Sequence, residues 1–150
     1  MSSPTSLPPT LDKMVQRFKR ATEPKRRYEQ LLYLAQKLDD FPADAKIPEN
    51  KVQGCVSQVY ITATLEDGKI QFQGDSDAQL TKGLLAFLIE GINGITPGEV
   101  IQLAPDFIAE TGLAASLTPS RANGFYNIFK TMQQKALILS GEVRSSDRIN

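Results

Sequence analysis

The sequence predicts a single α+β domain in which a small antiparallel sheet of two to three strands packs against flanking helices. Three observations lead to this fold class. Apolar residues recur at helical spacing towards both ends of the chain, and they alternate with polar residues in its middle. No linker or internal repeat divides the 150 residues, a length that buries enough apolar surface to fold without a metal or a disulfide.

Two helices are expected before the middle segment. Thr10 is placed to cap the first helix, which we expect to end near Thr22. The apolar positions of this helix are Leu11, Met14, Val15 and Phe18. Thr22 or Glu23 then caps a second helix, with Pro24 in its first turn. The apolar stripe of the second helix consists of Tyr28, Leu31, Leu32, Ala35 and Leu38.

The middle of the chain predicts a β-hairpin. Residues 59–65 alternate between apolar and polar side chains, which is typical of a strand with one buried face. Asp67 and Gly68 form a strong hairpin signal, because both residues tolerate the positive φ that a two-residue turn requires. Ile70 and Phe72 resume the alternation in a second strand. A third strand is left open by the pattern.

Capping signals predict two helices after the hairpin. Ser76 and Gln79 have the spacing of a capping box, and an apolar helix follows that we expect to end at residues 91–94. Thr96 and Glu99 repeat the same spacing before a short helix. Each pair can satisfy backbone N–H groups that a helix leaves unpaired at its start.

Two further helices complete the predicted domain. One covers residues 105–111 and ends at Gly112, and the last long helix begins at Thr118 and Pro119 and is expected to end at Gly141. The predicted boundaries are a disordered tail at residues 1–9, a domain at 10–141 and a C-terminal tail at 142–150.

The composition excludes most catalytic classes. The chain has no His, which excludes Ser-His-Asp hydrolysis, Cys-His proteolysis and His-bound catalytic zinc. Its single Cys excludes an internal disulfide, a CxxC redox pair and an iron-sulfur cluster held by the cysteines of one subunit. The sequence shows no metal-ligand cluster and no phosphate-binding glycine loop, so we expect neither a metal nor a bound cofactor.

Charge and hydropathy bear on partners and location. The 17 Lys and Arg residues balance 17 Asp and Glu residues, so no surplus charge drives binding to nucleic acid or to an anionic membrane. No apolar run reaches the length of a signal peptide or a membrane span. We therefore expect a cytoplasmic location, where a lone thiol stays reduced.

Cys55 is the one residue whose chemistry stands out. It follows Gly54 in the segment 52–58, directly before the first predicted strand. Free cysteines are often buried structural residues, but the thiolate is also the only strong nucleophile that this chain offers. No acid or base lies between Val52 and Tyr60, so activation must come from the fold or from a partner.

Two charged residues near helix starts have two interpretations. Asp75 follows Gly74 between the second strand and a helix, where it is either part of a polar site or part of a cap. Arg121 lies in the first turn of the last helix, where the helix dipole mildly disfavours a cation. This position predicts a compensating partner for Arg121, such as a carboxylate.

Four segments in this order and spacing resemble the SufE family of sulfur-acceptor proteins, which includes the CsdE-like proteins. They are Val52-Gln53-Gly54-Cys55-Val56-Ser57-Gln58-Val59-Tyr60, Gly74-Asp75-Ser76-Asp77-Ala78, Thr81-Lys82-Gly83-Leu84-Leu85-Ala86 and Leu117-Thr118-Pro119-Ser120-Arg121-Ala122-Asn123-Gly124. The resemblance extends from about Leu11 to Leu139. The chain departs from it at Val56 and Tyr60, where many relatives have Gln and Trp.

The resemblance implies that Cys55 accepts persulfide sulfur from a SufS-like cysteine desulfurase, stimulates that enzyme and relays the sulfur to an iron-sulfur scaffold complex. Such a protein is a carrier and activator, and not an autonomous enzyme. Pyridoxal phosphate belongs to the partner, no cofactor is bound, and the carrier is a monomer or weak homodimer. The fold resembles that of iron-sulfur scaffold proteins, but one cysteine cannot hold a cluster.

The resemblance also assigns supporting residues. It implies that the cysteine loop is sheltered in the free protein and moves outward when the desulfurase docks. The residues that shape and expose the loop are Gln53, Gly54, Ser57 and Gln58, and those linked to loop placement and partner engagement are Asp75 and Arg121. Two alternatives are an autonomous thiol redox protein and a non-catalytic protein-interaction module.

Overall fold

The computed structural model describes residues 7–149, and the side chains of residues 7–141. Its elements are α1 (Pro9–Arg20), α2 (Pro24–Lys37), the short 3-10 turns η1 (Ala43–Ala45) and η2 (Pro48–Asn50), β1 (Val59–Glu66), β2 (Lys69–Ser76), α3 (Gln79–Ile92), α4 (Pro97–Gln102), α5 (Asp106–Glu110), α6 (Leu113–Ser116) and α7 (Pro119–Ile149). Helices lie on both sides of one hairpin in the chain order, so the predicted α+β class is confirmed.

The hairpin is confirmed as predicted. β1 and β2 pair antiparallel in a register that runs from Val59 opposite Ser76 to Glu66 opposite Lys69. The turn has φ of 53° at Asp67 and 77° at Gly68, the positive values that a two-residue hairpin turn needs. Within residues 7–149 the sheet has these two strands, and Lys51 adds a single bridge to Tyr60 in place of a third strand.

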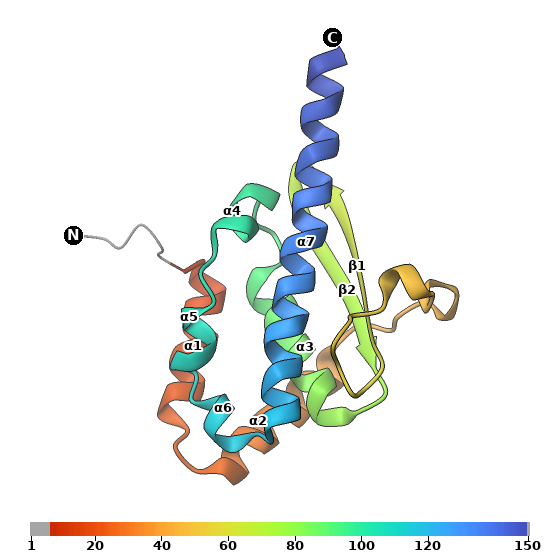
Figure 1. Cartoon of the computed structure of the whole chain (residues 1–150). Coiled ribbons are helices and arrows are strands. Elements are labelled where there is room, and N and C mark those ends of the chain that lie inside the picture. Colours follow the sequence, from red (N-terminus) through yellow and green to blue (C-terminus); the bar gives the residue numbers. More distant parts are fainter. Residues whose placement is uncertain (1–6, 150) are drawn as a thin grey trace, which may run out of the picture.

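Helix α3 lies at the centre of the domain. It contacts α1, α2, β2 and α7, and Figure 1 shows it behind α7 and between the N-terminal helices and the hairpin. Every residue from Gly83 to Ile89 is buried, which fits a helix that is apolar on all sides. Three edge-to-face aromatic contacts strengthen the core around it and link Phe18 with Phe87, Phe87 with Phe125, and Phe107 with Phe129.

Gly83 allows α2 and α3 to approach closely. A Cβ at this position would lie 2.3 Å from the carbonyl oxygen of Leu31, an impossible separation for two packed atoms. The glycine within the helix therefore serves packing between α2 and α3.

Helix starts show where local signals were sufficient and where they were not. Thr96 and Glu99 form the predicted capping box, with the Glu99 amide 3.2 Å from Thr96 Oγ1. The box predicted for Ser76 and Gln79 is wrong: α3 has Ala78 at its N-cap without a side-chain bond. Ser76 ends β2, and its Oγ accepts a hydrogen bond from the Ala78 amide.

Both end helices differ from their predicted limits. α1 begins at Pro9, with Pro8 and not Thr10 at its N-cap. α7 continues through the predicted end at Gly141 to Ile149. Among the described residues, nothing lies within 4 Å of a Cβ built on Gly141, so this glycine does not serve a close approach to another element. Residues 1–6 of the predicted N-terminal tail lie outside the described residues.

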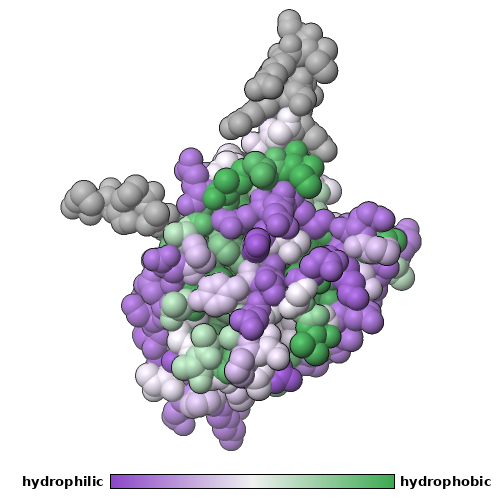
Figure 2. Space-filling model, in the orientation of Figure 1, coloured by the Kyte–Doolittle hydropathy of each residue, from purple (hydrophilic) through white to green (hydrophobic). Residues whose placement is uncertain are grey.

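The surface combines polar and apolar groups. On the face in Figure 2, the largest apolar group gathers where α4 meets α7. Each of these two helices has an exposed apolar side chain, Ile101 in α4 and Leu137 in α7. In α2 the buried leucines are Leu31, as predicted, and Leu34, whereas Leu32 of the predicted stripe is 39% exposed. No helix of the described chain has the length and apolarity needed to cross a membrane.

Candidate functional site

Cys55 lies on a short closed loop before the hairpin. The amide of Val52 donates a hydrogen bond of 2.8 Å to the carbonyl of Val59, which brings the two ends of the loop together. Gly54 has φ of 82°, a conformation that favours glycine, and it turns the chain just before the cysteine. Cys55 itself is partly buried, while the next side chain, Val56, is 87% exposed.

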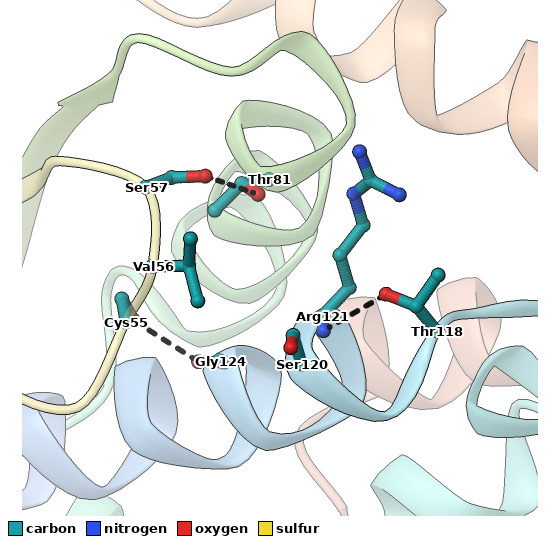
Figure 3. Close-up of a pocket in the computed structure, with 8 residues that line it drawn as sticks. All are labelled: Cys55, Val56, Ser57, Thr81, Thr118, Ser120, Arg121 and Gly124. Atoms are coloured by element: carbon teal, nitrogen blue, oxygen red, sulfur yellow. Dashed lines mark hydrogen bonds between the residues drawn. The ribbon is translucent and has the colours of Figure 1, made fainter.

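A pocket of about 200 Å³ opens beside the thiol. It is lined by Cys55, Val56, Ser57, Thr81, Thr118, Ser120, Arg121 and Gly124. Figure 3 shows that these residues come from three places: the cysteine loop, the first turns of α3 and the start of α7. The structure thus joins three of the four segments that carry the family resemblance.

The sulfur of Cys55 rests against the backbone of α7. Its Sγ lies 3.8 Å from the carbonyl oxygen of Gly124, a weak S–H hydrogen bond. Burial raises the pKa of the Cys55 thiol above its ordinary value, because a thiolate loses hydration in this position. The closed loop therefore keeps the cysteine in its less nucleophilic, protonated form.

Side chains anchor the loop on both sides of Cys55. Before it, Asn127 Nδ2 of α7 donates to the carbonyl of Gly54 at 3.0 Å. After it, the hydroxyls of Ser57 and Thr81 lie 3.4 Å apart. The Gln58 amide then donates to Asp77 Oδ1 at 3.0 Å, and the Asp77 amide donates back to the Gln58 carbonyl at 3.2 Å.

Asp75 supports the loop from outside the pocket. It lies on β2 opposite Tyr60, and its carboxylate binds Lys46 Nζ at 3.0 Å and Lys82 Nζ at 3.3 Å. Burial acts to raise the pKa of Asp75, but hydrogen bonds from Lys46 and then from Lys82 outweigh it, and the net pKa is lowered. Asp75 thereby connects the segment before the cysteine loop to α3, without touching the thiol.

Arg121 lines the pocket without the predicted carboxylate partner. Within the described residues it forms no ion pair, and its guanidinium points away from Cys55 in Figure 3. Its backbone amide is capped by Thr118 Oγ1 at 3.3 Å. An exposed cation is well solvated, and this explains why the unfavourable helix dipole needs no compensating charge. Gln53 is also exposed, on the solvent side of the loop.

Three anchoring side chains had no predicted role at the cysteine. Thr81, Asp77 and Asn127 act on the loop across 24, 19 and 73 residues of sequence, respectively. Thr81 and Asp77 lie in segments that resemble the family, which is a signal that could have indicated them. Asn127 lies beyond those segments, and nothing in the local sequence points to it.

The site combines a sheltered nucleophile with no proton acceptor or metal cluster among the described residues. Of the residues that the structure describes, Arg121 is the only charged one that lines the pocket, and an arginine cannot accept a proton from the thiol. Across the part of the chain that the structure describes, no three His, Cys, Asp or Glu side chains cluster to hold a metal. Fold and site together define a small α+β protein with one thiol on a loop and no general base among the described residues that line its pocket.

Comparison with known proteins identifies the family. The model of the SufE family, described as the Fe-S metabolism associated domain, matches residues 12–136. The chain belongs to the SufE family, and the predicted resemblance is confirmed. A solution structure of a hypothetical protein from Thermus thermophilus has a TM-score of 0.75 to this fold at 26% identity, over 87% of this chain and 96% of that one.

Curated relatives come from bacteria, plants and parasites. An uncharacterized SufE-like protein of Synechocystis is 67% identical over 88% of this chain and 83% of its own length. SufE-like protein 1, chloroplastic/mitochondrial, of Arabidopsis thaliana is 45% identical over 93% of this chain, which spans only 38% of that protein. The cysteine desulfuration protein SufE of Plasmodium vivax is 39% identical over 85% of this chain and 52% of its own length.

Proposed function

We propose that this protein accepts sulfur on Cys55 from the persulfide of a SufS-like, pyridoxal-phosphate-dependent cysteine desulfurase and carries it towards iron-sulfur cluster assembly. The family and the relatives named as cysteine desulfuration proteins support this function. The observation that carries it is a single thiol held in a pocket without a base. A carrier borrows its activation from a partner, whereas a self-sufficient thiol enzyme needs a base of its own.

The transfer step needs no external oxidant or reductant. The thiolate of Cys55 attacks the terminal sulfur of the donor persulfide, in a step analogous to thiol-disulfide exchange. A new S–S bond forms on Cys55, the donor S–S bond breaks, and its electron pair stays with the donor cysteine, which leaves as a thiolate. The proton of Cys55 passes to solvent or to a group of the desulfurase, because Arg121 cannot accept it.

The closed loop serves the carrier before and after transfer. The raised pKa of the buried thiol limits side reactions while the protein is free. Outward movement of the loop restores hydration to the thiolate and exposes it to the donor. Val56, which is already 87% exposed beside the cysteine, offers an apolar contact to the docking enzyme. Once loaded, the pocket beside Gly124 shelters the persulfide until delivery.

The supporting residues divide into two groups. Ser57 and Gln58 shape the loop through the Thr81 and Asp77 contacts, and Asp75 holds the preceding segment through its two lysines. Gln53 and Arg121 are exposed at the loop and the pocket, where a docked desulfurase can reach them. Their role in the proposal is partner engagement.

The proposal extends to the cellular setting. The carrier acts as a monomer or weak homodimer, binds no cofactor itself and delivers sulfur to a scaffold complex. The expected compartment is the cytoplasm, although the Arabidopsis relative is named chloroplastic/mitochondrial.

The test measures how fast a purified SufS-like desulfurase consumes free cysteine, with and without this protein. We expect the wild-type chain to raise the turnover and Cys55→Ser to leave it at the level of the desulfurase alone. Circular dichroism confirms that the serine variant keeps its helices. Equal stimulation by both chains would reject the relay and favour an interaction module. Peroxide consumption by the isolated chain would instead favour an autonomous redox protein.

A further inference from the structure

The two sides of the cysteine loop are held unequally. After Cys55, the Ser57 hydroxyl contact and two hydrogen bonds between Gln58 and Asp77 join the loop to neighbouring structure. Before Cys55, between the base of the loop and the thiol, the described residues provide one side-chain anchor, which is Asn127. Its Nδ2 lies 3.0 Å from the carbonyl oxygen of Gly54, the residue directly before the cysteine.

Gly54 and Asn127 fit each other closely. A Cβ on Gly54 would lie 2.6 Å from Nδ2 and 3.2 Å from Cγ of Asn127. The backbone can therefore pass against the amide only because Gly54 has no side chain. The same glycine has φ of 82°, which aims its carbonyl while the chain turns towards Cys55. Two independent features thus require glycine beside the Asn127 amide: the positive φ and the lack of space for a Cβ.

One helix face receives both the thiol and the carbonyl. Gly124, whose carbonyl oxygen faces Cys55 Sγ at 3.8 Å, lies three residues before Asn127 on α7, so the two are neighbours on the helix surface. The S–H contact is weak and neutral, whereas the amide bond at 3.0 Å has the length of an ordinary hydrogen bond. Between these two contacts on α7, the stronger restraint on the closed loop is that of Asn127.

We propose that Asn127 is a positioning residue that holds Cys55 in its pocket, and that release of its bond to Gly54 is part of the opening that exposes the thiol. The link to sulfur transfer rests on the proposed function, but the restraint on the thiol does not. The restraint requires a hydrogen-bond donor at position 127, because Gly54 offers a carbonyl oxygen, which an amide N–H can bind and a carboxylate repels.

The expected effect follows from the strength of one hydrogen bond. A neutral bond of this kind typically changes an equilibrium between bound and released states by about twofold to tenfold. If labelling of Cys55 requires the open loop, its rate changes by the same factor. The raised pKa of the thiol must fall in parallel, because an open loop restores water to the thiolate.

The experiment compares alkylation of the isolated full chain by iodoacetamide, followed by intact mass over a range of pH. Asn127→Ala removes the donor at a helical position where alanine is well tolerated, and Asn127→Asp keeps the shape but replaces the donor by an acceptor. Gln134→Ala is the matched control, since Gln134 is an exposed amide on the same helix with no hydrogen bond among the described residues. Thermal unfolding monitors folding of each chain.

Both Asn127 variants should label about twofold to tenfold faster than wild type, with a pH midpoint shifted downward, and Asn127→Asp should label at least as fast as Asn127→Ala. Gln134→Ala should behave as wild type. With a saturating desulfurase present, wild type and variants should converge, because the partner opens the loop in each. Wild-type rates and pH midpoints in both variants would overturn the proposal, as would an equal acceleration in the control.

Failure here is distinguishable from failure of the proposed function. The alkylation measurement on the free chain needs no desulfurase, so wild-type labelling in the Asn127 variants removes the restraint and leaves sulfur acceptance untouched. Conversely, a wild-type chain that never takes up sulfur rejects the carrier role, even where Asn127 controls the reactivity of the thiol.

Discussion

Substitution of Gly54 by alanine tests whether the closed cysteine loop requires a residue without a side chain at this position. Gly54 has φ of 82°, and an added Cβ would lie 2.6 Å from Asn127 Nδ2. Gly54→Ala therefore acts twice on the closed loop and leaves the remainder of the core in place. The strain is relieved when the loop moves away from α7, so we expect the variant to populate the open loop.

The expected increase in the open population follows from the cost of the positive φ and from the loss of the Asn127 hydrogen bond. A left-handed conformation costs a non-glycine residue roughly 1–2 kcal/mol. Displacement of the Asn127 amide loses a hydrogen bond of about 1 kcal/mol. Together they shift the loop equilibrium by about 2–3 kcal/mol, which corresponds to an increase of about 30-fold to 150-fold in the open population while that population is small.

The assay is the rate of Cys55 alkylation in the free chain at constant pH, with urea unfolding as the measure of global stability. Gly68→Ala is the matched control, because Gly68 also has a positive φ of 77° but nothing lies within 4 Å of its Cβ position. The control should lower the free energy of unfolding by roughly 1–2 kcal/mol and leave the labelling rate of folded protein unchanged. Labelling of Gly54→Ala at the wild-type rate would refute the requirement for glycine in the closed loop.

Three further perturbations test the electrostatics and packing around the site. Burial raises the pKa of Cys55, so the pH midpoint of its alkylation should lie above that of the same chain in concentrated urea, and coincident midpoints would contradict the sheltered loop. The lowered pKa of Asp75 contributes stability that is present above the ordinary carboxyl pKa, near pH 4, and is lost as pH falls through the folded value. Asp75→Asn should therefore lower the free energy of unfolding by about 1 kcal/mol at pH 7, and this difference from wild type should shrink as the pH falls through the lowered pKa of Asp75; a difference that persists in acid would assign the effect to packing. Gly83→Ala should destabilise the chain by about 1–3 kcal/mol in urea unfolding, because its Cβ would meet the Leu31 backbone. Gly141→Ala, whose Cβ has no described atom within 4 Å, should instead stabilise the helix by up to about 1 kcal/mol. Equal effects at the two sites would contradict the close approach of α2 and α3.

The elements that could be predicted are those encoded by neighbouring residues. The hairpin follows from alternation and from Asp67-Gly68, and the start of α4 follows from Thr96 and Glu99, because each signal acts within a few residues. The buried face of α2 depends on where α3 lies, which explains why Leu34 rather than Leu32 is inside. At Ser76 a local signal conflicts with sheet formation: its spacing to Gln79 predicts a helix cap, but the residue pairs with Val59 at the end of β2.

The candidate site was predictable in its chemistry and less so in its geometry. Cys55 could be singled out because no other strong nucleophile exists in the chain. The contacts that shelter it could not, since Asn127 reaches Gly54 across 73 residues and only the packing of α7 against β1 brings them together. Among the described residues no carboxylate lies beside Arg121 as expected, for a related reason: at an exposed position, solvent compensates a weak local dipole effect.

The most direct test of the carrier function is the mass of the intact chain after incubation with a cysteine desulfurase and free cysteine. The wild-type protein should gain one sulfur atom that a reductant removes, and peptide mapping should locate it on Cys55. Cys55→Ser, treated in the same way, should gain none. A wild-type chain that stays unmodified while the desulfurase is active, or an adduct that persists in the serine variant, would contradict sulfur acceptance at this thiol.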